Sequence, residues 1–303
     1  MTAVVKSAPG LETPGRALAL ADGPAIAPNG GAAEGPPYPF ALRSSLPFML
    51  FHLVPLAAIW TGVTTRALVL FGVAYVVRMF CITAGYHRYF AHRAFRTGRI
   101  FQFLLALGGL MATQKGPLWW AAHHRRHHRE SDTARDVHSP KHGIVWSHVG
   151  WVVSSEFGPT DFDSIRDFAK YGELRWLNKH DWVGPWSLGV LCFLVGGWSG
   201  LVVGFFASTI ALWHATFMVN SVAHLVGRRR YDTGDTSRNN WFVAVCTGGE
   251  GWHNNHHHYQ ASARQGFRWW QIDTTFYCLK VLSWFGVVRD LKGVPERVLH
   301  AGR

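Results

Sequence analysis

One long stretch without charges constrains the fold of this chain more than any other feature. From residue 182 to residue 227 no Lys, Arg, Asp or Glu occurs. A membrane span needs about 20 apolar residues, so this stretch is too long for one span and suits two. The glycine-rich residues 196–200 are the natural turn between them. The sequence therefore predicts two spans, at about residues 182–198 and 201–224.

Two more apolar stretches come earlier, at about residues 46–62 and 67–86. Each is long enough to cross a bilayer, and the tight connection TGVTTR between them predicts a helical hairpin. Arg78 is the only charge in the second stretch. Because a lipid-facing charge at mid-depth costs several kcal/mol, its side chain either snorkels to the interface or faces the bundle interior. The predicted fold class is an all-α membrane protein with four transmembrane helices in two hairpins.

The distribution of charge predicts which side of the membrane holds the polar parts. Charged residues are only 16% of the chain, below the roughly 25% of soluble domains, and the net charge is +12. Most basic residues lie between or after the hairpins, as on the cytoplasmic side of membrane proteins. Four spans place the N-terminal tail and residues 87–181 and 225–303 on that side, the last two as a helical cap. Since no nucleic-acid-binding motif accompanies the charge, we expect a lipid bilayer as partner and no nucleic acid.

The remaining segments are expected to add little beyond this bundle. Residues 1–40 are rich in Ala, Gly and Pro, which predicts a disordered tail and not a signal peptide, and residues 41–303 are expected to form one domain. Residues 100–113 are short for a span and predict a core or interfacial helix, or alternatively a re-entrant segment; residues 276–288 predict an amphipathic helix. The four cysteines are far apart, which argues against a disulfide framework and a cysteine metal site.

Half of the 18 histidines fall into spaced sets around the ends of the predicted spans. An H-x-x-H-H pattern places three rings on one face of an α-helix. Residues five apart cannot share a face of a continuous α-helix, so the second span is expected to end near His87, with the chain bending to return His92. The sets are His87 and His92 in HRYFAH, His124, His127 and His128 in HRRHH, His224 in NSVAH, and His253, His256 and His257 in HNNHH.

Nine histidines together indicate metal binding. They exceed the four ligands of zinc and the six of an octahedral ion, so we expect two ions with four or five imidazoles each, plus water or a substrate oxygen. Imidazole suits Zn, Cu, Fe and Ni, so the spacing leaves the metal open. Only one frame of H-x-x-H-H fits each run, because Arg126 and Asn254 occupy the positions that a shifted frame needs. The histidines not expected to bind metal are His52, His123, His138, His142, His148, His180, His214, His258 and His300.

The histidine motifs resemble, in order and spacing, those of membrane-bound fatty acyl desaturases of the stearoyl-CoA desaturase type. They are GYHRYFAH, HRRHH, NSVAH and GEGWHNNHH, joined by SHVGW at residues 147–151 and WWQID at residues 269–273. The resemblance covers residues 47–273 and implies a four-span fold with a cytosolic cap that holds two iron ions, Fe2+ or Fe3+. The ligands that it implies are His87, His92, His124, His127, His128, His224, His253, His256 and His257, with Asn220 reaching the metal through a water.

The same resemblance implies the reaction and its partners. With O2 as co-substrate, two hydrogens leave adjacent methylenes of a long-chain fatty acyl group, giving a cis double bond, commonly at position nine. Such carbons carry no acidic proton, so a metal–oxygen oxidant is required. No haem motif HPGG occurs, so electrons come from a separate donor such as ferredoxin, cytochrome b5 or a reductase. The acyl carrier, which could be CoA, a carrier protein or a glycerolipid, stays open. Residues 258–264 depart from the FPxDYR-like loop of many relatives.

Charged residues near the histidines have expected roles as well. Ligating imidazoles usually donate their second N–H to a carboxylate or carbonyl, so five acids are candidate partners of the rings. Three arginines either meet an anionic head group or face anionic lipid. The acids are Asp132, Asp136, Asp163, Asp235 and Glu250, and the arginines are Arg125, Arg126 and Arg129.

Two other functions remain open at this point. A membrane hydroxylase of fatty acids or alkanes would share the metal site but leave oxygen on carbon; NSVAH and WWQID favour the desaturase. A metal transporter or sensor predicts ligands that line a path through the bilayer, whereas the histidine clusters lie outside the predicted spans. The expected location is a multi-pass integral membrane protein with its site on the cytosolic face, in a bacterial plasma membrane rather than the endoplasmic reticulum.

Overall fold

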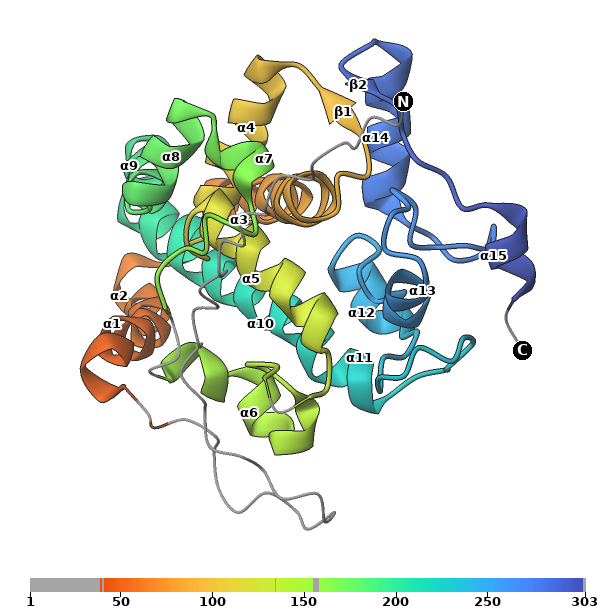
Figure 1. Ribbon diagram of the computed structural model, residues 1–303. Coiled ribbons are helices and arrows are strands. Elements are labelled where there is room, and N and C mark those ends of the chain that lie inside the picture. The colour runs from red at the N-terminus through yellow and green to blue at the C-terminus, as the bar shows by residue number, and fades with distance from the viewer. Residues whose placement is uncertain (1–38, 40, 134, 155–157, 302–303) are drawn as a thin grey trace, which may run out of the picture. The chain divides into compact units, whose positions relative to one another are not determined.

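The computed structural model describes residues 39, 41–133, 135–154 and 158–301, and most of these residues are helical. Apart from residue 39, the predicted tail over residues 1–40 lies outside the described residues. In chain order (Figure 1) the elements are α1 (Leu42–Leu53), η1 (Val54–Ala57), α2 (Ala58–Thr61), α3 (Thr65–Phe80), η2 (Cys81–Ala91), β1 (Arg96–Thr97), α4 (Arg99–Leu110), α5 (Pro117–Glu130), η3 (Pro140–His142), α6 (Ile144–His148), η4 (Gly150–Val153), α7 (Arg166–Ala169), α8 (Gly172–Lys179), α9 (Val183–Ser199), η5 (Gly200–Ala207), α10 (Ser208–Asn220), α11 (Val222–Leu225), α12 (Trp241–Cys246), α13 (His253–His258), α14 (Thr274–Trp284), β2 (Val288–Arg289) and α15 (Glu296–His300).

In the described part of the chain, two helical stretches are long and apolar enough, by length and composition, to cross a membrane. They are Thr65–Ala91, which joins α3 to η2, and Val183–Leu225, which joins α9 through α11. Two shorter apolar helices cover Ser45–Thr61 and Arg99–Leu110. The stretch predicted as a first span, at about residues 46–62, is the Ser45–Thr61 helix and has about the expected length. Its α-helical hydrogen bonding gives way to a 3-10 turn, η1, that begins next to Pro55, a residue without a backbone N–H.

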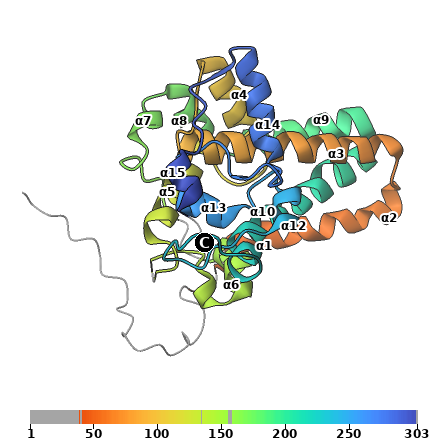
Figure 2. The ribbon, with the colours of Figure 1, turned by 90° about the vertical axis from the view of Figure 1, so that its right-hand side faces the viewer.

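The helix Val183–Leu225 is broken at Gly197, inside residues 196–200 where the sequence predicts a turn. Gly197 has φ 62° and ψ −153°, a conformation that side chains other than glycine rarely adopt. Beyond the break, the π-helix η5 returns along α9: a Cβ added to Gly200 would lie 2.3 Å from the carbonyl oxygen of Cys192. Figure 2 shows these two arms beside α3. Gly197 thus permits the reversal of the chain, and Gly200 permits the close approach of the two arms.

The helix that carries His87 continues to Ala91, so the prediction that the second span ends near His87 is wrong. α3 continues as the π-helix η2 as far as Ala91, and the backbone N–H of His92 donates to the carbonyl of His87 over 3.1 Å. In a π-helix the hydrogen bonds join residues five apart, which places such residues almost above one another. The rings of His87 and His92 accordingly lie 4.8 Å apart between centroids. A change of helix type, rather than a bend after His87, brings the two rings together.

Arg78 faces the bundle interior, which decides between its two predicted placements. Its side chain is 1% exposed. Its guanidinium donates to the hydroxyls of Ser208 and Thr209, each over 2.6 Å, and to the carbonyl of Ala74. Neutral acceptors therefore satisfy this buried cation, and they connect α3 to the start of α10.

Close packing around η2 positions the segment that follows it. Helix α4 overlaps the predicted short helix 100–113, and a Cβ on its Gly109 would lie 2.3 Å from the ring of Tyr86. The chain after η2 is tied to the C-terminal part by an antiparallel pair, β1 with β2, in which Arg96 is opposite Arg289. This short ladder is an exception to the all-α prediction. Helix α14 begins and ends a few residues earlier than the predicted amphipathic helix 276–288.

Gly184 offers a test of the packing between α9 and α4. A Cβ at Gly184 would lie 2.6 Å from the backbone carbon of Leu110, so Gly184→Leu forces the two helices apart. We expect the free energy of unfolding to fall by about 1–3 kcal/mol. The matched control is Gly189→Ala on the same helix, whose new methyl group would meet Phe205 at 3.5 Å, an ordinary contact. Heating in detergent followed by size-exclusion chromatography measures both; equal midpoints would contradict the packing described.

Candidate metal centre

The nine predicted histidines converge in two groups, drawn from four elements of the chain. The first group has five members whose ring nitrogens all lie within 4.8 Å of one another: His87 and His92 from η2 and its end, His124 and His128 from α5, and His256 from α13. Their Nε2 atoms form successive contacts of 3.0 Å, from His92 to His124, His128, His256 and His87. Five imidazoles from three segments thus face one small volume.

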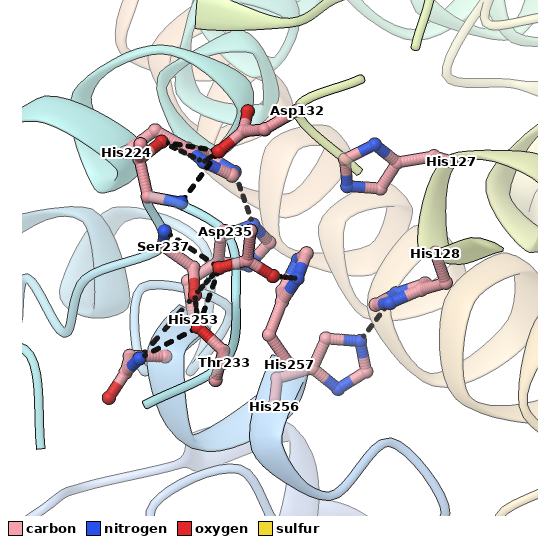
Figure 3. Close-up of polar contacts among 12 residues, drawn as sticks. His127, His128, Asp132, His224, Thr233, Asp235, Ser237, His253, His256 and His257 are labelled. Carbon is pink, nitrogen blue, oxygen red and sulfur yellow. Dashed lines mark hydrogen bonds and ion pairs between the residues drawn. The ribbon is translucent and has the colours of Figure 1, made fainter. Parts of the chain in front are cut away.

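The second group contains His127 of α5, His224 of α11, and His253 and His257 of α13, again with ring nitrogens within 4.8 Å. The Nε2 atoms of His224 and His253 are 3.1 Å apart. Figure 3 shows His127 and His128 approaching from one side and the α13 rings from the other. Because α5 and α13 each supply rings to both groups, the two groups lie next to each other.

Carboxylates contact the outer nitrogens of two rings in the second group. Nδ1 of His257 is 2.6 Å from Asp235, and Nδ1 of His127 is 3.1 Å from Asp136. Since an ionised carboxylate only accepts, the proton of each neutral ring is on Nδ1 and the lone pair is on Nε2. The acids therefore fix the tautomer that a metal ligand needs.

His224 is oriented by a different kind of partner. Its Nδ1 lies 3.1 Å from the hydroxyl of Thr236, and that hydroxyl donates to Asp132 over 2.7 Å. The backbone N–H of Thr236 donates to the same carboxylate oxygen. Asp132 therefore acts on His224 through Thr236.

A buried ion-pair network orients His87 in the first group. Its Nδ1 contacts Glu250, which also pairs with Arg88 over 2.9 Å. Arg88 is 1% exposed and pairs in addition with Asp273 over 2.9 Å, while Gln265 donates to Glu250 over 3.0 Å. Asp273 also accepts from the N–H of Phe276, capping α14. The network joins η2 to α14. Its Asp273 is the last residue of the WWQID motif, which gives this motif a structural role.

The two asparagines between the α13 histidines fasten that helix in place. Asn254 accepts from the backbone N–H of Tyr231 over 2.8 Å and donates to its carbonyl. Asn255 donates to the carbonyl of Gln265 over 2.8 Å and to the side chain of Gln271 over 3.0 Å. Both are fully buried. A six-residue helix is thereby held rigidly enough to present three rings to two groups.

The donor set fits metal ions and fits little else. With its proton on Nδ1, His87 accepts at Nε2, so a proton on Nε2 of His256 satisfies this contact but leaves none for the equally short contact, 3.0 Å, between His256 and Nε2 of His128. Nε2 of His257 is buried, with no hydrogen-bond partner among the described residues. Buried polar atoms are rarely left unpaired. The two groups are therefore able to hold metal ions, in line with the histidine spacing.

Electrostatics favours the neutral ligand form of most of these rings. Burial first, and the neighbouring imidazoles second, lower the pKa of His92, His124, His128, His253 and His256 well below the usual value. Burial also lowers the pKa of His127, but the Asp136 carboxylate outweighs it and raises that pKa overall. Burial would raise the pKa of Glu250, yet His87 and Arg88 hold it at about 2. Neutral imidazole is the form that binds metal.

Not every predicted neighbour of the site lies in it. Asp132, Asp136, Asp235 and Glu250 contact the histidines or their partners, but Asp163 is 82% exposed and pairs with Arg166. Asp163 is therefore wrong as a partner of a ligand ring. Asp163 lies in the segment before α7, and its sequence position gave no indication of the direction of its side chain.

Asn220 ends α10 and is partly exposed. The predicted arginines differ in their surroundings. Arg125 donates to the carbonyls of Phe90 and Ala91 and pairs with Asp167, so it closes the end of η2 and is not available for a head group. Arg126 donates to the carbonyl of Arg135. Arg129 is exposed.

A surface pocket opens beside the first group, and the loop that departs from the family lines it. The rings of His92 and His128 line this pocket, so it connects the surface with the first histidine group. Its lining residues are Ala91, His92, Arg125, His128, Arg129, Gln260 and Ala261.

His138 is a site residue that the sequence reasoning missed. Its Nδ1 lies 3.5 Å from the Asp136 carboxylate that also contacts His127, and these three residues form a third possible metal-holding group. Burial lowers the pKa of His138 to about 4. The only signal was its spacing, two residues after Asp136.

These features define the class: a mostly helical protein with long apolar helices and a buried polyhistidine centre able to hold two metal ions. The profile of the fatty acid desaturase family matches residues 64–281. The chain therefore belongs to the fatty acid desaturase family, and the predicted resemblance is confirmed. It is an oxidoreductase of the fatty acyl desaturase kind.

Relatives act on differently carried acyl groups, as their names state. An acyl-CoA 5-desaturase of Anemone leveillei is 38% identical over 80% of this chain and 74% of its own. An sn-1 stearoyl-lipid 9-desaturase of Anabaena variabilis is 38% identical over 80% of this chain and 88% of its own. A chloroplastic palmitoyl-monogalactosyldiacylglycerol delta-7 desaturase of Arabidopsis thaliana is 36% identical, covering 80% of this chain and 66% of its own.

Removing Arg88 tests the buried network. Arg88→Met leaves the Glu250 and Asp273 carboxylates buried without their cation, which costs about 3–5 kcal/mol of folding free energy. We expect a strongly lowered midpoint of thermal unfolding. Arg166→Met, which breaks the exposed pair with Asp163, is the control and should leave the midpoint unchanged. Similar midpoints for the two variants would argue against a stabilising network.

Replacing Asp235 tests the orientation of His257. Asp235→Asn removes the carboxylate that fixes the His257 tautomer, so metal affinity should fall about 10–100-fold. Metal content measured by mass spectrometry after dialysis against graded chelator reports this loss. Asp163→Asn is the matched control and should retain its metal. Unchanged retention in Asp235→Asn would show that the carboxylate does not support a ligand.

Proposed function

We propose that this protein uses two histidine-bound iron ions to desaturate a long-chain fatty acyl group with O2, forming a cis double bond. The observation that carries the proposal is the division of nine imidazoles into neighbouring groups of five and four. All nine ligands expected from the resemblance are in these groups, and Asn220, which ends the helix before His224, is proposed to reach the second ion through water.

Iron is the metal that matches both the ligands and the reaction. Imidazole binds several metals, but removal of hydrogen from unactivated methylenes needs a redox-active one. When bound, iron supplies the oxidising power toward the methylenes, with O2 as oxidant and electrons from a separate protein donor such as ferredoxin, cytochrome b5 or a reductase. Asp136, Asp235 and Glu250 hold the rings that bind it.

The arrangement of helices suits a substrate that dissolves in lipid. We propose four membrane crossings in two hairpins: the Ser45–Thr61 helix with Thr65–Ala91, and the two arms of Val183–Leu225 on either side of Gly197. Figure 2 has these helices extending to one side of α5 and α13. The histidine site then lies on the cytosolic face, where the basic segments favour the cytoplasm, in a bacterial plasma membrane.

The proposed substrate is a stearoyl-type chain carried by CoA or by a lipid, with the double bond at position nine. Two relatives named as sn-1 stearoyl-lipid 9-desaturases, from Anabaena variabilis and Synechocystis, support this position. Relatives named for positions five and seven show that the family varies in this respect. The position is decided by which methylenes the protein holds against the metal site.

Expression in a host without its own desaturase tests the proposal. Gas chromatography with mass spectrometry of total fatty acids should show a new monounsaturated species, absent with His257→Ala because a ligand of the second group is lost. His258→Ala is the matched control: its ring stacks on Tyr231, outside both groups, and should preserve the product. Fatty acids with one added oxygen and no new double bond would instead identify a hydroxylase, and an active His257→Ala would remove the metal site from the mechanism.

A further inference from the structure

Three histidines outside the metal groups form a hydrogen-bonded chain that their spacing in sequence does not suggest. They are His52 of α1, His148 of α6 and His214 of α10. Nε2 of His52 lies 3.2 Å from Nε2 of His214, whose other nitrogen, Nδ1, lies 3.0 Å from Nε2 of His148. The rings are joined in line through both nitrogens of His214, unlike a chelating group, in which one nitrogen of each ring converges on one point.

Backbone carbonyls close both ends of this chain. Nδ1 of His52 donates to the carbonyl of Phe48 over 2.8 Å. At the other end, Nδ1 of His148 is 2.9 Å from the hydroxyl of Ser221, and that hydroxyl is 2.9 Å from the carbonyl of Phe217. The chain thus runs from α1 across α10 to the junction of α10 with α11.

The neutral chain of three imidazoles and one serine has one proton fewer than it has hydrogen-bond contacts. Five contacts link the two terminal carbonyls, and each hydrogen bond needs one proton. A neutral serine and neutral imidazoles contribute one proton each, which is one fewer than the contacts. The neutral chain therefore always contains one unfilled contact. It can accept one proton, and any of the three rings can carry the resulting charge while every bond is kept.

The three histidines lie among aromatic rings, without a carboxylate partner in the described part of the chain. The neighbouring rings are Phe48, Trp213 and Phe217, and no ion pair within the described part of the chain includes His52, His148 or His214. Burial lowers the pKa of His148, which lies outside the apolar helices, so this ring of the chain favours its neutral form. Ionisable groups within membrane-spanning helices commonly serve proton pathways.

The end of the chain lies next to the second histidine group. Ser221 directly follows Asn220, and the backbone N–H of His224 donates to its carbonyl over 3.2 Å. His224 is a member of the second group. A proton released at the Ser221 hydroxyl is therefore within one helical turn of a ligand ring.

We infer that His52, His214, His148 and Ser221 form a proton relay that takes up one proton and gives it to the histidine site. This rests on the proposed desaturation. Each turnover breaks two C–H bonds and reduces one O2 to two waters, using two electrons from the donor and two protons from the protein. In the relay, solvent water gives one proton to the partly exposed His52 end, each N–H or O–H bond breaks as the next one forms, and the proton that leaves Ser221 ends in one of the two waters.

The test uses His214→Asn, because an amide keeps hydrogen bonds at this position but does not pass a proton. Membranes containing the full protein receive reductant, donor protein and stearoyl lipid, and double bonds and hydrogen peroxide are both measured. We expect double-bond formation to fall about tenfold or more and peroxide per electron consumed to rise, because O2 is reduced without its protons. His148→Asn, in the cap, should reproduce both changes. His180→Asn is the control and should match wild type, because Nδ1 of His180 donates to the carbonyl of Trp176 over 2.9 Å, apart from the relay.

A second readout does not depend on activity. In metal-free protein with 15N-labelled histidine, the relay predicts that His52, His148 and His214 titrate as one unit, so His214→Asn shifts the imidazole signals of both partners. Independent titration of the three rings would overturn the relay, as would wild-type coupling of electrons to double bonds in both asparagine variants. A wild type that forms no double bond but keeps the coupled titration would contradict the proposed function and leave the proton chain standing.

Discussion

The buried ion pairs of Arg88 are the interaction on which the rest of the site depends. One guanidinium, without access to water, holds Glu250 and Asp273 at once. Glu250 in turn contacts His87, and Asp273 begins α14. The desolvation of these charges is offset only while all of them are present, since a lone buried charge is strongly unfavourable. Placement of η2, of the α14 segment and of the first ligand ring is therefore a single cooperative event.

The histidine sets show how far the sequence alone reaches. H-x-x-H-H is a statement about one helical face, and helices α5 and α13 present their rings as that pattern predicts. The pattern did not reveal that His124 and His128 turn to one group while His127 turns to the other. That division depends on where the neighbouring helices lie, which no local spacing contains.

Other features escaped prediction for reasons that are equally physical. The same residues can form an α-helix or a π-helix, so HRYFAH alone did not show how the ring of His92 reaches that of His87. The hydrogen bond from the N–H of residue 92 to the carbonyl of residue 87 shows that the segment is a π-helix. The chain of His52, His148 and His214 links residues more than 60 positions apart, from segments that share no motif. The turn at Gly197, by contrast, was predictable, because a cluster of glycines has few other uses between two apolar runs.

The acids behind the ligand rings have a consequence for the charge of the centre. Imidazoles are neutral ligands, so two divalent ions held by nine of them would keep all four of their positive charges in a buried site. Around the histidines, five buried carboxylates, Asp132, Asp136, Asp235, Glu250 and Asp273, stand against the one buried guanidinium of Arg88, a net of four negative charges. These charged side chains and two divalent ions would together be electrically neutral. Each electron delivered to or removed from the ions would then leave the interior with one unbalanced charge, and the movement of a proton is the simplest way to cancel it.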